Sequence, residues 1–145
     1  MTGVSFHTGV DDPVDYACRL LRKGHRQGAR IQVVAPAVDL GRLDHLLWVF
    51  DPQDFVPHVH LRTGQPVPDR LHRTPVWLVD PDVSWPVQVP LPQMLLRWGQ
   101  AEAVELQGWE RVIEIVSNDA PDRQAARQRW RAYEASGATL QHHSA

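Results

Sequence analysis

Residues 4–35, which read VSFHTGVDDPVDYACRLLRKGHRQGARIQVVA, decide the fold class. The run Val4 to Thr8 is β-like, and the sequence Asp11-Asp12-Pro13 then offers a capping carboxylate and a proline suited to the first turn of a helix. The apolar residues that follow recur at i, i+3, i+4 and i+7, as on one face of a helix: Val14, Ala17, Cys18 and Leu21. Ile31 to Ala35 is a continuous apolar run, typical of a strand covered on both faces. The short helix-to-strand connection predicts a parallel, right-handed crossover.

A second helix and a proline-rich middle follow this unit. Asp39 can cap that helix, which is expected to end at Asp51-Pro52 and to bury a stripe formed by Leu40, Leu43, Leu47 and Phe50. Nine of the twelve prolines lie between Pro52 and Pro92, so turns and edge strands are expected there rather than helices. The segments of strand composition are residues 76–79, 94–98 and 112–116.

The last predicted element is a helix that Asp119 or Asp122 caps and that runs to about Ser136, with Gly137 as its stop. The C-terminal tail, residues 138–145, is expected to be extended or mobile. Together the elements predict a single α/β domain over residues 1–145. Its central sheet is mostly parallel and flanked by helices, with a topology like that of a mononucleotide-binding domain.

The composition and net charge of the chain exclude several classes of function. The chain has 145 residues, of which 43% are hydrophobic and 22% charged, as in an ordinary soluble domain. Cys18 is the one cysteine, so no disulfide can form within the chain and a cytoplasmic location is expected. No apolar run approaches the ~20 residues that span a membrane, and the N-terminus does not resemble a signal peptide. The net charge of −2 argues that any role with DNA is indirect or confined to a local patch.

Several kinds of catalytic or cofactor chemistry are missing from the sequence. The turn Thr8 to Pro13 reads TGVDDP, which is no phosphate-binding loop, and its two aspartates would repel phosphate. His58 and His60 would share one face of a strand, either as a metal pair or as exposed histidines in a proline-rich loop, but no HExxH motif or second cysteine supports zinc. Cys18 lies on an apolar helix face, as an inert core thiol would. We therefore expect no catalytic residue, metal or cofactor.

Two segments predict protein binding. In the first, residues 46–58, Trp48 and Phe55 lie around a proline turn where both are hard to bury, as in a binding anchor, although they could also close the edge of the domain. The second segment is the last helix, in which a row of arginines lies beside an apolar row. The arginines, spaced at i, i+4 and i+8, are Arg123, Arg127 and Arg131. The apolar row consists of Ala126, Trp130, Tyr133 and Gly137. Such a surface suits an acidic peptide that ends in a hydrophobic group. The alternative is a solvated basic face beside a core-facing stripe.

These same segments carry a family resemblance. Residues 47–58 resemble the LW…FVPH block of the chi subunit of bacterial DNA polymerase III. Residues 127–137, RQRWRAYEASG, resemble that family's R-x-R-Y-K-A-Y-x-x-x-G helix, and residues 112–116 match the strand before it. Trp130 and Arg131 depart from the usual tyrosine and lysine but keep the aromatic face and the charge. Residues 64–110 match poorly.

The resemblance implies a non-catalytic accessory subunit of the clamp-loader assembly in DNA replication. It implies that Trp48, Phe55, Pro57 and His58 bind the psi subunit, or a helicase at the same surface. It also implies that the acidic tail of single-stranded DNA-binding protein binds the last helix, through Arg127, Trp130, Arg131, Tyr133 and Gly137. Two other classes stay open: a direct binder of single-stranded DNA and a small enzyme of the nucleotide-binding type.

Overall fold

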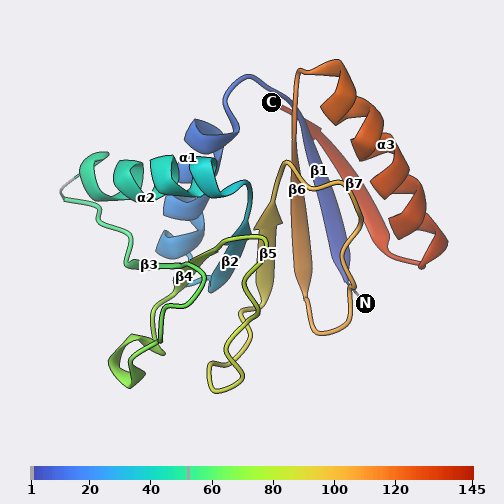
Figure 1. Cartoon of the computed structure of the whole chain (residues 1–145). Helices are drawn as coiled ribbons and strands as arrows, with labels where there is room; N and C mark the ends of the chain where they lie inside the picture. The colour runs from blue at the N-terminus through green and yellow to red at the C-terminus, as the bar shows by residue number, and fades with distance from the viewer. Residues whose placement is uncertain (1, 52) are drawn as a thin grey trace.

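An all-parallel sheet of seven strands forms the centre of the computed structural model, which describes residues 2–51 and 53–145 (Figure 1). The strand order is β3-β4-β2-β5-β6-β1-β7. The strands span Gly3–Val10 (β1), Ile31–Val34 (β2), His58–Leu61 (β3), Val76–Val79 (β4), Met94–Arg97 (β5), Arg111–Ser117 (β6) and Thr139–Ser144 (β7). The predicted α/β class and parallel sheet are confirmed.

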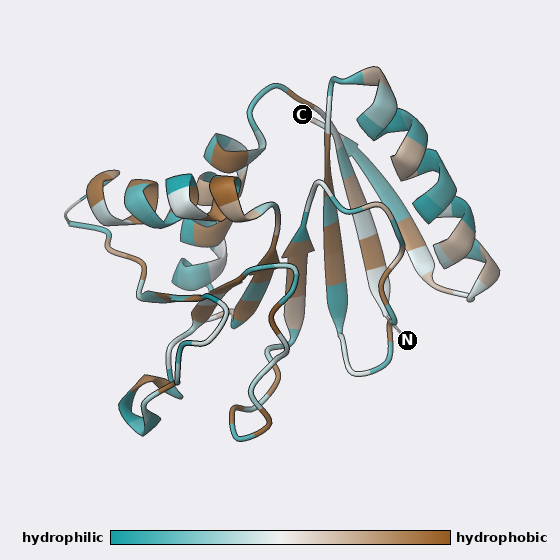
Figure 2. Ribbon diagram, viewed as in Figure 1, coloured by the Kyte–Doolittle hydropathy of each residue, from teal (hydrophilic) through white to brown (hydrophobic). Residues whose placement is uncertain are grey.

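Helices cover the two faces of the sheet unequally. Helices α1 (Pro13–Arg26) and α2 (Ala37–Val49) pack on one face, and α3 (Ala120–Ala135) packs on the other (Figure 1). Alternate residues of β6 serve the two cores, since Ile113 lies with α1 and Val112 lies with α3. Figure 2 shows apolar residues concentrated on the central strands, while the outer side of α3 is polar.

Loops replace a helix over the β3–β4 end of the sheet, on the face opposite α1 and α2. Trp77 and Val79 of β4 lie buried there beneath Val67, Val83 and Trp85 from the proline-rich connections, the first of which contains the short helix η1 (Asp69–Leu71). Indole groups fix these connections, because Trp77 Nε1 donates to Thr74 O at 2.7 Å and Trp85 Nε1 donates to Val89 O at 2.8 Å.

The caps of the helices differ in part from the prediction. Asp12 caps α1 as expected, accepting from the backbone N–H of Val14 at 3.1 Å. Asp39 does not cap α2, because the helix already begins at Ala37; its carboxylate accepts from Trp98 Nε1 at 2.9 Å instead. Asp119 takes the cap position of α3, but its carboxylate accepts no capping hydrogen bond from the backbone of the helix as described.

Phe50 is a correction to the predicted buried stripe of α2. It lies just beyond the end of the helix, is 44% exposed, and stacks under the guanidinium of Arg22, 4.3 Å from the ring centre. Leu40, Leu43 and Leu47 are buried as predicted. Pro52, which was expected to end this helix, lies outside the described residues.

The C-terminal tail takes the extended form of the two that the sequence left open. Thr139–Ser144 form β7 and pair with β1 in parallel, with Phe6 opposite His142. Gly137, at φ +83°, ends α3 and lets the chain turn back to the sheet. Strand β7 satisfies the backbone of β1, which would otherwise be an open edge.

Candidate protein-binding sites

A groove of about 590 Å³ runs between α3 and the sheet; we call it the α3 groove. Three elements besides α3 contribute to it, namely β1, β6 and β7. Its lining consists of Phe6, Thr8, Val116, Arg123, Ala126, Arg127, Trp130, Arg131 and His142. The structure thus brings together Arg127, Trp130 and Arg131, three of the five residues that the resemblance assigns to tail binding. The β-strand contributors were not predicted, although the alternation of the run Val4 to Thr8 could have placed Phe6 beside the helix.

The arginines of the α3 groove are exposed and unpaired. Arg123, Arg127 and Arg131 lie four residues apart on the outer side of α3, and none of them forms an ion pair with any residue that the structure describes. Beside them the floor of the groove is apolar. Trp130 is half-buried, and its ring packs edge-on against Phe6 with the ring centres 5.2 Å apart. Positive charge beside an aromatic floor suits a ligand that is both acidic and apolar.

Tyr133 and Gly137 lie outside the lining of the groove. Tyr133 is 1% exposed, because it lies two turns from the buried Ala126 on the side of α3 that faces the sheet. Burial and the neighbouring Glu114 carboxylate raise the pKa of its hydroxyl well above the usual range. Gly137 lies beyond the end of the helix. Tyr133 therefore supports the groove from beneath rather than offering a contact surface.

A buried ionic cluster holds α3 on the sheet. Glu114 of β6 is fully buried, with its Oε1 3.3 Å from Arg129 Nε and its Oε2 3.4 Å from Arg97 Nε. Tyr133 OH donates to Glu114 Oε2 at 2.5 Å, and Arg129 Nη1 donates to Gln100 O at 2.7 Å. The cluster links α3, two strands and the loop after β5. Sequence reasoning missed it, and the signal was the glutamate inside the apolar strand VIEIV.

The aromatic patch is a second surface, made of the exposed Trp48 and Phe55 and of His58, whose side chain is only 1% exposed. Trp48 is 59% exposed and Phe55 is 39% exposed, with their ring centres 4.9 Å apart. The His58 ring lies 5.3 Å from Trp48, and its Nε2 lies 3.0 Å from Asp44 Oδ1. Pro57, the other residue predicted here, adjoins the patch and is half-buried. Trp48 and Phe55 are therefore exposed rather than buried at the edge of the domain.

Ion pairs fix the loop that carries Phe55. Arg22 Nη2 lies 3.0 Å from Asp54 Oδ2 and 3.3 Å from Asp51 Oδ2, and Arg26 also hydrogen-bonds Asp54. These hydrogen bonds lower the pKa of the Asp54 carboxyl, and the bond from Arg26 has the larger effect. The loop is thus tied to α1, which presents Phe55 beside Trp48 in a defined position.

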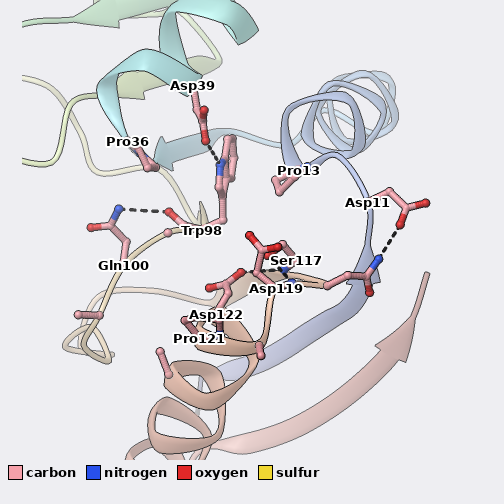
Figure 3. Close-up of a pocket in the computed structure, with 15 residues that line it drawn as sticks. Asp11, Pro13, Pro36, Asp39, Trp98, Gln100, Ser117, Asp119, Pro121 and Asp122 are labelled. Carbon is pink, nitrogen blue, oxygen red and sulfur yellow. Dashed lines mark hydrogen bonds between the residues drawn. The ribbon is translucent and has the colours of Figure 1, made fainter.

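The crevice at the carboxyl ends of the strands, where open α/β sheets usually bind ligands, is acidic. It has a volume of about 750 Å³ and its lining includes Asp11, Asp39, Asp119 and Asp122, with no lysine or arginine among the described residues (Figure 3). Asp122 Oδ2 accepts from Ser117 N at 2.8 Å, so its carboxylate faces the turn between β6 and α3. Four carboxylates disfavour a phosphate here.

The histidine pair of the sequence lies on β3 and serves the fold. His60 Nε2 lies 2.7 Å from Asp80 Oδ1, and His58 contributes to the aromatic patch. Within residues 2–51 and 53–145, no group of three or more His, Cys, Asp or Glu side chains is arranged to hold a metal ion. In the same residues, no helix is long and apolar enough to cross a membrane.

The class that these features define is an open, parallel α/β sheet with an acidic crevice in place of a phosphate site. A family model described as DNA polymerase III chi subunit, HolC, matches residues 1–141. A curated protein of Pseudomonas aeruginosa, named DNA polymerase III subunit chi, is 30% identical over an alignment of 158 positions, which covers 99% of this chain and 96% of that protein. The chain belongs to the DNA polymerase III chi subunit family.

A solved structure shares the fold alone. The crystal structure of the C-terminal part of the Fun30 ATPase domain superposes with a TM-score of 0.56 at 10% sequence identity. The match covers 79% of this chain and 44% of that one, so this chain spans less than half the length of that structure.

Proposed function

We propose that this chain is a non-catalytic accessory subunit of the DNA polymerase III clamp-loader assembly and links it to single-stranded DNA-binding protein during replication in the cytoplasm. The α3 groove carries the proposal. Its exposed arginines have no acidic partner among the described residues, and they lie beside an apolar floor. An acidic protein tail that ends in an aromatic residue would satisfy both features.

The contacts divide between charge and packing. Arg127 and Arg131 hold carboxylates of the tail, because a guanidinium forms strong, charge-assisted hydrogen bonds to carboxylate oxygens. The terminal aromatic side chain packs on Trp130 and Phe6, whose rings already contact each other edge-on. Tyr133 supports Phe6 from the core, with its ring centre 6.0 Å from that of Phe6.

The aromatic patch is proposed to bind the psi subunit, with a helicase as an alternative partner at the same surface. Exposed aromatic side chains on a fixed loop are typical anchors of protein interfaces. Trp48 and Phe55 offer the anchor, Pro57 borders it, and the buried ring of His58 packs against both aromatic rings. The patch involves α2 and the loop after it, whereas the groove involves α3 on the opposite face of the sheet (Figure 1). One chain can therefore hold both partners at once.

Calorimetry with synthetic peptides tests the proposal directly. The full chain should bind an acidic peptide that carries a C-terminal aromatic residue, and deletion of that residue should cost about tenfold or more in affinity, because the apolar floor loses its contact. A basic peptide of the same length is the control and should not bind. An affinity that is indifferent to the terminal residue would contradict the proposed role of Trp130 and Phe6.

Direct binding of single-stranded DNA is the second candidate, since unpaired arginines beside Trp130 could also contact phosphates and stack on a base. An oligonucleotide titration in the absence of other protein discriminates between the two. The proposal predicts binding of the peptide without DNA. Binding of the oligonucleotide together with indifference to the peptide would favour the second candidate.

A further inference from the structure

A separate pocket lies on the face of the sheet opposite the α3 groove. It has a volume of about 520 Å³ and lies between α1 and strands β6, β1 and β7. Because α3 packs on the other face, the described residues provide no helix over β1 and β7 here (Figure 1). Neither the α3 groove nor the aromatic patch contributes a residue to this pocket.

The charges around this pocket have one sign. Its charged side chains are Lys23 of α1 and Arg111 of β6, and two imidazoles, His7 of β1 and His143 of β7, lie beside them. No aspartate or glutamate from the described part of the chain lines the pocket. Its floor is apolar and includes Leu96 and Ile113, both buried. A basic rim over an apolar floor complements a molecule with an anionic end and an apolar body.

The side chain of His7 has a buried ring nitrogen that no described residue hydrogen-bonds. The residue is 8% exposed, and its Nδ1 is hydrogen-bonded to the hydroxyl of Tyr16 at 2.5 Å. Its Nε2 is also buried, and within residues 2–51 and 53–145 it has no hydrogen-bond partner. Buried polar atoms are rarely left unpaired, because the loss of water is then not compensated. The other pocket imidazole, His143, lies with its ring centre 4.9 Å from that of His7.

The positive charges around the pocket also act on the protonation of His7. Burial, His143 and Arg111, in that order, lower the pKa of His7 from 6.5 to about 4. Tyr16, Lys23, His143 and Arg111 are the titratable groups that line the pocket with it, and none of them supplies a negative charge near neutral pH. A bound anion would offset the repulsion between these groups and would favour the protonated imidazole.

We propose that this pocket binds a small organic anion, with its carboxylate or phosphate group held by Arg111, Lys23 and the His7–His143 pair and its apolar body packed on Leu96 and Ile113. Both oxyanions present the same acceptor chemistry to guanidinium, ammonium and imidazole donors. The site does not depend on the proposed tail binding, because it lies on the other face of the sheet.

The test is an NMR titration of the full chain with phenyl phosphate, inorganic phosphate and benzoate. Saturable shifts of the His7 and His143 ring signals are expected with phenyl phosphate, together with a rise of the pKa of His7 above about 4. Phenyl phosphate should bind about tenfold more tightly than inorganic phosphate, because its ring covers the apolar floor. The ratio of benzoate to phenyl phosphate affinity tells which oxyanion the site prefers.

Two arginine variants make the test specific. Arg111→Ala removes an exposed charge at the start of β6 and should weaken phenyl phosphate about tenfold. Arg70→Ala removes another exposed arginine, from η1 at the β3–β4 edge of the sheet, and should leave the affinity unchanged. The absence of saturable shifts, equal affinities for the two phosphates, or an affinity that Arg111→Ala leaves intact would each overturn the proposal.

Discussion

Helix α3 carries the same residue type on two sides with opposite surroundings. Arg129 faces the sheet, is 1% exposed, and lies against the buried carboxylate of Glu114. Arg127 and Arg131 face solvent, and neither forms an ion pair with a described residue. A buried guanidinium needs its partner for the fold to form, whereas an exposed, unpaired one is available to another molecule. Tertiary surroundings, not residue type, separate the structural arginine from those proposed to bind.

The largest expected effect comes from removing the partner on the buried side. Glu114→Ala leaves the guanidinium groups of Arg97 and Arg129 buried without their carboxylate, and the free energy of unfolding should fall by roughly 3–5 kcal/mol. Denaturant unfolding measures the loss. Glu134→Ala, an exposed glutamate on the same helix, is the control and should change stability by no more than about 0.5 kcal/mol. A loss below about 1 kcal/mol for Glu114→Ala would mean that the cluster does not hold α3.

The aromatic patch allows the same comparison for aromatic side chains. Trp77 is fully buried beneath the proline-rich loops, whereas Trp48 and Phe55 are exposed. Phe55→Ala should weaken binding of the psi subunit by about 2 kcal/mol or more, because truncation of an interface anchor removes its buried contact. A pulldown and a melting curve together measure this. Val87→Ala, which truncates a side chain 99% exposed elsewhere, is the control and should bind normally. If Phe55→Ala melts earlier but binds normally, Phe55 serves the fold.

Added salt should weaken peptide binding by the exposed arginines of α3, but it should hardly change the contribution of the buried ion pairs to stability. This effect is expected to be smaller than those of the substitutions above. Exposed charges are screened by ions, so the affinity of the α3 groove for an acidic peptide should fall severalfold between about 0.05 and 0.5 M salt. Buried pairs are screened much less, so the stability difference between the wild-type chain and Glu114→Ala should hardly change over this range. Calorimetry gives the first quantity and denaturant unfolding the second. A peptide affinity independent of salt would contradict the assignment of the arginines as its charge partners.

Much of the fold could be predicted because apolar runs and helical spacing report burial directly. The strands near Val4, Ile31, Val76, Met94 and Val112 all lie within the sheet, and α1 buries the predicted stripe. Strand β7 could not be predicted in this way, because it contributes backbone hydrogen bonds at an edge and carries mostly polar, exposed side chains. Phe50 fits the helical spacing of α2, but the helix ends one residue before it.

The candidate site was predictable only in its helical part. The spacing of Arg127, Trp130 and Arg131 placed them on one side of a helix, and all three line the α3 groove. The same spacing could not tell that Tyr133 turns into the core, where Glu114 accepts its hydrogen bond. Nor could it distinguish Arg129 from its exposed neighbours, since an arginine is buried only where distant residues supply its partners. Those partners come from β6 and from the loop after β5.

Calorimetry of Arg131→Ala with the acidic tail peptide tests the central claim most directly. Loss of one charge-assisted contact should cost roughly 1.5–3 kcal/mol, or about ten- to a hundredfold in affinity, while stability stays within about 0.5 kcal/mol of the wild-type chain. Arg70→Ala removes the same charge away from the α3 groove and should bind the peptide as the wild-type chain does. An unchanged affinity for Arg131→Ala, or an equal loss for Arg70→Ala, would mean that the exposed arginines of α3 are only a solvated surface.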